Sequence, residues 1–477
     1  MTQHFINGRH VSGRTGETMS VVAPATGEEF TRIACGSAED VDDAVKAARA
    51  AYEGAWGRLT AAERGRLIAK LGQKVLDRFD ELAQTEAQDT GKPMAQARAD
   101  IEATARYFEF YGGAADKVHG HVIPFLNGYS VSVVHEPHGV TGHILPWNYP
   151  AQMFGRSLTA SLAMGNAVVL KPAEEACQTA LKLAVLASEV GFPDGAINIV
   201  TGRGHEAGAA LSAHPGIGFM SFTGSPEVGK LVQHACAENL IPCTLELGGK
   251  SPQIVFDDAD VAAAVPVVCK AIVQNTGQTC SAGSRVLVQQ GIYDGFMGAV
   301  AEQFAKLRAG TPEMDLDCGP VINARQRGRV QSFIDQARDQ GIPVIAEGQI
   351  AQGVPNGGYY VTPTLFGQVP RGNRLEQEEV FGPVLAAFSF TDEEDAIRLA
   401  NSTAYGLVAG VWTGNGDRQQ RVAKRVRAGQ VFINGYGAGG GIELPFGGTG
   451  KSGHGREKGF IALEEFAVTK TIIHRHG

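Results

Sequence analysis

Two side chains near the middle of the chain could form a nucleophile and its base. Cys280 lies in Gly277-Gln278-Thr279-Cys280-Ser281, a loop of small polar residues, whereas Cys236 and Cys269 lie in helical patterns typical of a core. A cysteine in a polar loop can reach a substrate and be activated by a neighbouring group. Taken alone, the motif fits an inert buried thiol equally well.

Glu246 is the carboxylate that could serve such a thiol. It ends the apolar run 244–247 and precedes Gly248 and Gly249. Burying an acid is costly unless it is paired or used, and a raised carboxyl pKa suits a general base near neutral pH. A helix-cap role or an ion pair with a nearby lysine is the alternative.

Two segments could bind the phosphates of a nucleotide. The segment 202–207, Gly-Arg-Gly-His-Glu-Ala, follows an apolar run and matches the dinucleotide fingerprint, but a plain turn is the better interpretation. In the second, Phe222-Thr223-Gly224-Ser225, an apolar run ends where a helical pattern containing Gly229 begins. Ser225 could cap this helix, whose free N–H groups suit a pyrophosphate, although capping alone also explains the serine.

The elements that must position these residues are predicted from periodicity. Residues 39–107 have the apolar spacing of amphipathic helices. From 165 to 247, short apolar runs alternate with helical stretches, which predicts a parallel sheet with right-handed crossovers. A second α/β region extends from 251 to 434, with helices near 293–307 and 326–340 and strands at 384–390 and 408–412.

A β-ribbon is predicted between Gly128 and Leu145, where one alternating run precedes Pro137-His138-Gly139 and a second, 140–145, follows it. The end of the chain, Phe466 to His474, is also β-prone. It should pair with this ribbon or with another subunit.

Composition excludes several classes of protein. With 477 residues, 43% hydrophobic and 19% charged, the chain is long enough for about three folding units and is not disordered. The net charge of −8 argues against nucleic acid. Seven scattered cysteines without a C-x-x-C pair argue against disulfides and zinc and favour a reducing cytoplasm. We expect a soluble protein without a membrane span or a metal site.

Considered together, seven motifs resemble the aldehyde dehydrogenase superfamily in order and spacing, over essentially the whole chain. They are Pro146-Trp147-Asn148-Tyr149-Pro150, Lys171-Pro172-Ala173-Glu174, Phe222-Thr223-Gly224-Ser225, Glu246-Leu247-Gly248-Gly249-Lys250, Gly277-Gln278-Thr279-Cys280, Glu379-Val380-Phe381-Gly382-Pro383 and Pro445-Phe446-Gly447-Gly448.

The resemblance implies an α/β protein with three parts. These are a Rossmann-like NAD-binding domain at 1–118 and 144–248, a second α/β catalytic domain at 249–448, and a β-ribbon oligomerisation domain at 119–143 and 449–477. It also implies a homodimer or homotetramer.

For the chemistry, the resemblance implies oxidation of an aldehyde to the carboxylic acid through a thiohemiacetal and a thioester on Cys280. Glu246 would be the base and would later activate water, and Asn148 would stabilise the oxyanion with the Cys280 N–H. The cofactor-binding residues implied are Trp147, Lys171, Glu174, Gly224, Ser225, Gly229, Glu379 and Phe381.

The choice of cofactor depends on Lys171 and Glu174, which resemble residues that hold the adenosine ribose. A carboxylate accepts hydrogen bonds from free ribose hydroxyls and repels a 2′-phosphate, so NAD is favoured over NADP. Arg156 and Tyr149 are the implied substrate residues. Arg156 matches an arginine that holds the distal carboxylate of succinate semialdehyde in some members, but Gln274 occupies the position of their second arginine.

The substrate is therefore either a semialdehyde or another polar aldehyde, or one of a broad range of aliphatic and aromatic aldehydes. Three other functions compete with hydrolytic dehydrogenation. A CoA-acylating member would lack the glutamate at 246, and a catalytically silent relative would be expected to have lost Cys280 or Glu246. A cofactor-free cysteine hydrolase would need a histidine beside the thiol.

Overall fold

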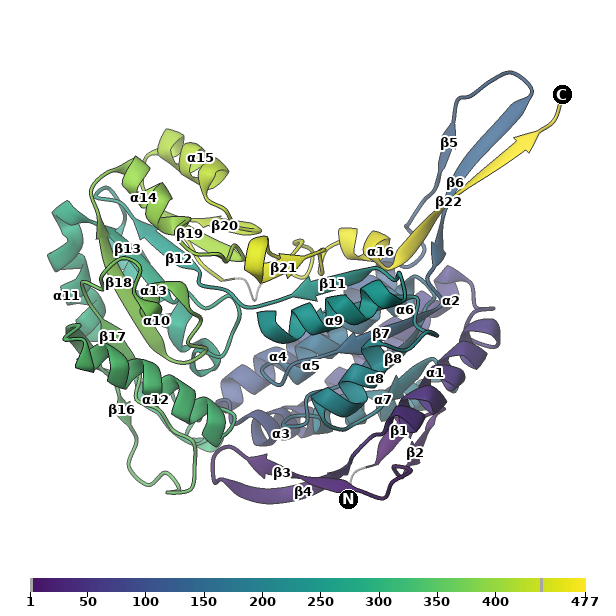
Figure 1. The fold of residues 1–477 in the computed structure, drawn as a ribbon, viewed down its shortest axis with the longest axis horizontal. Helices are drawn as coiled ribbons and strands as arrows, with labels where there is room; N and C mark the ends of the chain where they lie inside the picture. Colours follow the sequence, from purple (N-terminus) through teal and green to yellow (C-terminus); the bar gives the residue numbers. More distant parts are fainter. Residues whose placement is uncertain (1–2, 438–440) are drawn as a thin grey trace.

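A computed structural model of the chain describes residues 3–437 and 441–477, arranged as two α/β bodies and a projecting ribbon (Figure 1). Residues 1–2 and 438–440, which belong to the predicted ranges 1–118 and 249–448, lie outside the described part. Each body has its own hydrophobic core, because the buried apolar residues of the first sheet cluster separately from those of the second.

The first body is built on an eight-stranded sheet whose five inner strands are parallel. In sheet order its strands are β2 (Arg9–Val11), β1 (His4–Ile6), β9 (Ile197–Ile199), β8 (Ala167–Lys171), β7 (Val140–Ile144), β10 (Phe219–Thr223), β11 (Cys243–Glu246) and β21 (Gly453–His454). The inner strands β7, β8 and β10 are buried on both faces, as is usual for a parallel sheet with helices on each side.

Helices cover both faces of this sheet. One layer contains α1 (Ala38–Glu53), α8 (Ala209–Ser212) and α9 (Pro226–Glu238); the other contains α2 (Ala61–Asp77), α3 (Phe79–Thr90), α4 (Met94–Ala114), α6 (Thr159–Ala163) and α7 (Gln178–Glu189). The cap of α1 is typical of their local signals, because Ser37 and Asp40 form a reciprocal capping box. A separate hairpin pairs β3 (Thr18–Ala23) with β4 (Glu28–Ala34).

The second body has a seven-stranded sheet that is parallel except at one edge. Its strands are β15 (Val344–Glu347), β17 (Thr364–Phe366), β18 (Val384–Phe390), β13 (Arg285–Gln289), β12 (Pro252–Val255), β19 (Val408–Trp412) and β20 (Gln430–Ile433). Its helices are α10 (Val261–Val273), α11 (Tyr293–Phe304), α12 (Ala324–Asp339), α13 (Arg374–Gln377), α14 (Glu393–Ala400) and α15 (Gly416–Arg425), and a small pair joins β14 (Arg308–Ala309) to β16 (Gln349–Ile350).

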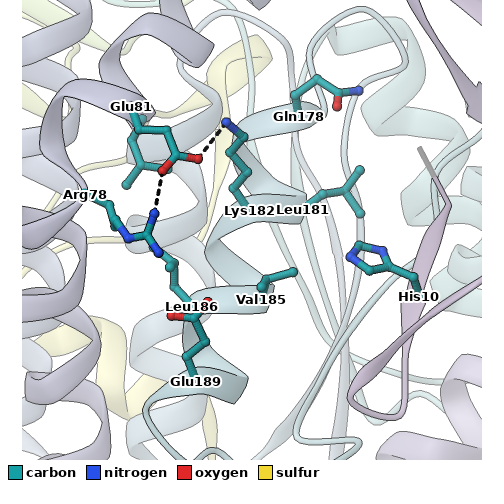
Figure 2. Close-up of a pocket in the computed structure, with 10 residues that line it drawn as sticks. His10, Arg78, Glu81, Gln178, Leu181, Lys182, Val185, Leu186 and Glu189 are labelled. Carbon is teal, nitrogen blue, oxygen red and sulfur yellow. Dashed lines mark hydrogen bonds and ion pairs between the residues drawn. The ribbon is translucent and has the colours of Figure 1, made fainter. Parts of the chain in front are cut away.

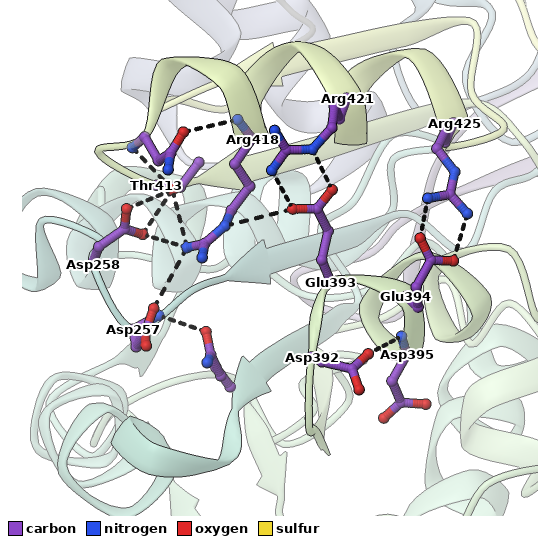
Figure 3. Close-up of polar contacts among 12 residues, drawn as sticks. Asp257, Asp258, Asp392, Glu393, Glu394, Asp395, Thr413, Arg418, Arg421 and Arg425 are labelled. Carbon is purple, nitrogen blue, oxygen red and sulfur yellow. Dashed lines mark hydrogen bonds and ion pairs between the residues drawn. The ribbon is translucent and has the colours of Figure 1, made fainter.

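Ion pairs attach the strongly polar helix α15 to its neighbours (Figure 3). Arg421 and Arg425 contact Glu393 and Glu394 of α14, and Arg418 lies 3.0 Å from Asp258. This helix buries only Val422, so these pairs, together with the Arg418 guanidinium stacked on a phenylalanine, fix its position.

Three strands form the ribbon that projects from the first body: β22 (Ala467–Arg475), β6 (Tyr129–Pro137) and β5 (His121–Ile123). Of the two partners predicted for the last segment, the ribbon is the one observed, since β22 runs antiparallel to the whole of β6. The second run of the predicted ribbon is different. Residues 140–144 form β7, an inner strand between β8 and β10 in which all five residues are buried. The polar side chains of Thr141 and His143 are accommodated there because they hydrogen-bond to each other and to two buried serines.

The other predicted elements agree with the structure. The strands at 384–390 and 408–412 are β18 and β19, and the helices near 293–307 and 326–340 are α11 and α12. Among the described residues, no helix is long and apolar enough to cross a membrane.

Candidate active site

The C-terminal ends of four parallel strands converge at one edge of the first sheet. In the register, Ile144 of β7 lies opposite Lys171 of β8, and Thr223 of β10 lies opposite Glu246 of β11. The loops that leave these strands therefore bring together Asn148, Lys171, Ser225 and Glu246, which are far apart in the sequence. Ligands of open α/β sheets bind at this edge.

Cys280 lines a pocket formed by both bodies. Tyr149, Arg156 and Gln274 lie in the same pocket, so the structure brings the predicted nucleophile and both predicted substrate residues together. The remaining lining residues are Tyr107, Gln152, Met153, Thr279, Ser281, Phe446 and Lys458. Gln274 donates a hydrogen bond to the Tyr149 hydroxyl at 3.3 Å. It is the residue that stands where the resemblance implies a second arginine in enzymes that oxidise succinate semialdehyde.

A constrained backbone turn presents Cys280. Asn275 and Thr276 both have positive φ, at 48° and 58°, as does Gly277 at 72°. A side chain at Gly277 would place its Cβ 2.2 Å from the carbonyl oxygen of Gly382, so only glycine fits. Burial raises the pKa of the Cys280 thiol to about 12, which the positive charge of Arg156 partly offsets. The resting thiol is therefore protonated at neutral pH and needs a base.

Asn148 is buried beside the nucleophile loop. Its Nδ2 donates to the carbonyl oxygen of Gln278 at 2.9 Å, which orients the amide and leaves its second N–H for another acceptor. The backbone carbonyl oxygen of Asn148 accepts hydrogen bonds from Asn275 Nδ2 at 2.8 Å and from Lys92 Nζ at 3.0 Å.

Glu246 is almost completely buried at the end of β11. Burial raises its pKa well above the ordinary value, and Arg156 provides the largest opposing effect. The guanidinium of Arg156 lies 3.4 Å from Glu246 and 2.5 Å from Glu457. A Cβ added at Gly447 would lie 2.8 Å from a Glu246 oxygen, so the glycine makes room for this carboxylate. Its position and raised pKa suit a base.

The side of the site formed by the second body contains Glu379 and Phe381. Glu379 accepts a hydrogen bond from the Gly249 N–H at 3.0 Å, while burial raises its pKa to about 7. Phe381, at a positive φ of 58°, packs edge-to-face on Trp147 with 5.4 Å between the ring centroids. The structure thus places two more of the predicted cofactor residues in contact across the two bodies.

The second segment predicted to bind phosphate lies at the start of α9. Ser225 caps this helix by accepting from the Val228 N–H, and Gly229 packs so closely on Leu247 that an added Cβ would lie 2.7 Å from it. The hydroxyl of Thr223 is buried there without a hydrogen-bond partner among the described residues. A helix N-terminus with an unsatisfied hydroxyl fits a pyrophosphate.

Lys171 and Glu174 form an ion pair of 2.8 Å at the end of β8. The Glu174 carboxylate also accepts from the Gly204 N–H, so the glycine segment 202–207 lies beside the predicted ribose residues. Burial favours a raised pKa for Glu174, but Lys171 outweighs it and the pKa is lowered. The carboxylate is thus ionised at neutral pH.

Sequence reasoning did not identify three charged residues of this site. Glu457 and Lys458 follow the C-terminal glycine cluster, and Lys92 follows α3; all three are buried. The sequence offered one signal for these residues, which is that they stand beside or near the turn glycines Gly91 and Gly455. Charged residues at turn glycines are equally typical of a solvated loop, so this signal does not identify a site.

A second pocket lies between α3 and α7, away from Cys280 (Figure 2). Glu81 bridges Arg78 and Lys182 at its wall, and no predicted site residue lines it. Within residues 3–437 and 441–477, no group of three or more His, Cys, Asp or Glu side chains could hold a metal ion.

Comparison with known proteins places this geometry in a family. Residues 10–472 match the model of the aldehyde dehydrogenase family. An aldehyde dehydrogenase from Emericella nidulans is 43% identical over 475 residues, covering 99% of this chain and 95% of that protein. A crystal structure of a Burkholderia cenocepacia protein assigned as an aldehyde dehydrogenase is 60% identical over the full length of both chains, with a TM-score of 0.99. The NAD⁺ complex of a Bacillus cereus aldehyde dehydrogenase is 40% identical and covers 100% of this chain and 97% of that one, with a TM-score of 0.97.

Proposed function

The chain belongs to the aldehyde dehydrogenase family and is an aldehyde-oxidising enzyme, and we propose that it works by hydrolysis of a thioester on Cys280 with NAD as its cofactor. The observation that carries this proposal is that a partly buried thiol, Cys280, shares one pocket with Arg156, whose guanidinium contacts the buried carboxylate of Glu246. A CoA-acylating enzyme would have no use for this carboxylate.

The chain's own residues account for each proton and charge. Glu246 takes the proton of Cys280 directly or through water, and the thiolate adds to the aldehyde carbon. The second N–H of Asn148 Nδ2 and the backbone N–H of Cys280 stabilise the oxyanion. After hydride loss, Glu246 releases the proton taken from Cys280 to solvent and is again a carboxylate. It then removes a proton from the water that attacks the thioester carbon, the C–S bond breaks, and Cys280 leaves as the thiolate while the carboxylic acid is released.

The cofactor residues fit NAD. Ser225 and the start of α9 would hold the pyrophosphate, Lys171 and Glu174 the adenosine ribose, and Glu379 the nicotinamide ribose. NAD supplies the acceptor of the hydride when it is bound. The ionised Glu174 supports NAD rather than NADP, because it would repel a 2′-phosphate.

Two classes of substrate are supported by specific features of the pocket. Arg156 and Lys458 favour an aldehyde with a polar or anionic far end, whereas Phe446, Tyr149 and Met153 favour a broad range of aliphatic or aromatic aldehydes. Comparing kcat/KM for succinate semialdehyde and hexanal distinguishes the two. A preference for hexanal would exclude the anionic class.

NADH absorbance after mixing the protein with NAD and a panel of aldehydes tests the proposed function, with Cys280→Ala and NADP in parallel. We expect NADH formation that disappears in the variant. NADH formation by Cys280→Ala would contradict the mechanism, and ester cleavage without NAD that needs no Glu246 would favour the cysteine hydrolase instead.

We also propose that the chain forms a homodimer or homotetramer through the ribbon of β5, β6 and β22. Its support is the exposed apolar surface there, since Phe125 and Leu126 are 61% and 63% exposed and Ile473 is 60% exposed. Exposed apolar patches of this kind mark association surfaces.

A further inference from the structure

Arg156 contacts two carboxylates at the proposed active site. Its side chain is 6% exposed, its Nε lies 2.5 Å from Oε2 of Glu457, and its Nη2 lies 3.4 Å from Oε2 of Glu246. The guanidinium also lies over the ring of Phe446, 4.4 Å from the centroid. Its charge is therefore already engaged by groups of the protein.

Glu457 is anchored independently of Arg156. The Ser221 hydroxyl donates to Glu457 Oε1 at 2.9 Å and contacts the Ser157 hydroxyl at 2.9 Å, which in turn contacts Nδ1 of His143 at 2.8 Å. This chain of buried polar groups crosses β10 and β7, and burial lowers the pKa of His143 to about 3, so the imidazole stays neutral. Glu457 is thus fixed by its own hydrogen bond and holds Arg156 in place.

We infer that Arg156 is a positioning residue for the general base: braced by Glu457, its guanidinium orients the carboxylate of Glu246 and favours its ionised form. This inference rests on the proposed function, in which Glu246 activates the thiol and later the water. It gives Arg156 a role that does not depend on what the far end of the aldehyde carries.

The charges around Glu246 determine the sign of the effect. The charged and titratable groups that face it are Arg156, Arg456, Glu457, Lys458 and Cys280. Burial raises the pKa of Glu246, Arg156 lowers it most strongly, and Glu457 raises it by less than Arg156 lowers it. We therefore expect loss of Arg156 to raise this pKa.

A substrate clamp predicts a different outcome. A guanidinium reserved for a distal carboxylate would matter for succinate semialdehyde and hardly for hexanal. A guanidinium that acts through Glu246 affects both substrates equally, because both pass through the same base. The two roles are therefore separable by substrate and by pH.

The test is the pH profile of kcat for both aldehydes in Arg156→Met and Arg156→Lys. We expect the acid limb to move to higher pH by about one unit or more in Arg156→Met with both substrates, and Arg156→Lys to restore part of the shift. Because Arg156→Met leaves Glu457 buried without its partner, the double variant Arg156→Met/Glu457→Gln is measured as well and should keep the shift. An acid limb that stays in place, or a loss confined to succinate semialdehyde, would overturn the inference.

A second readout needs no dehydrogenase activity. The rate of alkylation of Cys280 by iodoacetamide, followed by peptide mass spectrometry against pH, reports thiolate formation. Arg156→Met should slow alkylation at pH 7 more when Glu246 is present than in a Glu246→Gln background. Equal effects in the two backgrounds would overturn the inference. A wild-type protein that forms no NADH would contradict the proposed function and leave this comparison valid.

Discussion

Lys92 donates a hydrogen bond from its ammonium group to the backbone carbonyl of Asn148 at 3.0 Å, across 56 positions of sequence. The lysine is completely buried, contacts Asp100, lies 3.2 Å from Glu86, and is stacked 4.6 Å from the ring centroid of Tyr149. This cation links the turn after α3 to the residue proposed to stabilise the oxyanion.

Replacing Lys92 with Met should therefore destabilise the protein. It leaves Glu86 and Asp100 buried without their cation, which costs roughly 3–5 kcal/mol of unfolding free energy. Urea unfolding measures the loss. The surface variant Lys182→Met, which breaks an exposed pair with Glu81, should cost less than about 1 kcal/mol. Similar values for the two variants would show that the buried lysine is not a structural cation.

Replacing Glu246 with Gln should slow both the activation of the Cys280 thiol and the hydrolysis of the thioester, because the amide can accept a proton from neither the thiol nor the water. We expect kcat to fall by roughly 10²- to 10⁴-fold, and an acyl group that does form on Cys280 to persist long enough to be seen by intact mass. Burial raises the pKa of Glu246, so wild-type activity should fall as the pH is lowered through that value, because the base becomes protonated. A Glu246→Gln variant that hydrolyses its acyl group at the wild-type rate would refute the assignment.

Binding of NAD should weaken as the pH falls through about 7, where the Glu379 carboxylate, whose pKa burial raises, becomes protonated. An ionised carboxylate accepts hydrogen bonds from ribose hydroxyls more strongly, so Kd should rise by roughly 3- to 10-fold between pH 8 and pH 6. Quenching of tryptophan fluorescence by NAD measures it. The dependence should disappear in Glu379→Gln and persist in Glu378→Gln, whose carboxylate instead pairs with Arg374.

The choice between cofactors should change when Glu174 is replaced by Ser. Removing the carboxylate leaves Lys171 to meet a 2′-phosphate, and the ratio of kcat/KM for NADP to that for NAD should rise by roughly 10-fold. Glu206→Ser removes an exposed carboxylate that pairs with Arg203 and should leave the ratio unchanged. An unchanged ratio in Glu174→Ser would mean that this carboxylate does not face the ribose.

Charges on the ribbon should dissociate the assembly. Ile472 and Ile473 are 48% and 60% exposed on β22, and Lys at both positions would place charge in an apolar interface. Light scattering after size exclusion should show a smaller assembly than for the wild type. Ile350→Lys, on β16 of the second body, is the matched control. A wild-type protein that elutes as a monomer would contradict the proposed interface.

Short-range patterns made much of this architecture predictable. The strands β18 and β19 were predicted at their observed bounds, and the Ser225 cap and the pairing of the last segment with the ribbon were also correct. These features depend on alternation, apolar runs and caps, which act over a few residues. The family was identifiable because its motifs lie in ordered loops at strand ends, and the family comparison confirms that identification.

Assignments that depend on distant partners could not be made in this way. The run 140–145 was predicted in the ribbon because a short β-prone run looks alike in a hairpin and in a parallel sheet. Only the neighbours of residues 140–144, β8 and β10, distinguish the two. Arg156 contacts Glu246 and Glu457, which come from two other regions of the chain. No local sequence signal indicates that these three residues meet. Residue types and spacing thus predict the chemistry proposed for Cys280 and Glu246, whereas the charges around them arise from contacts that exist only after folding.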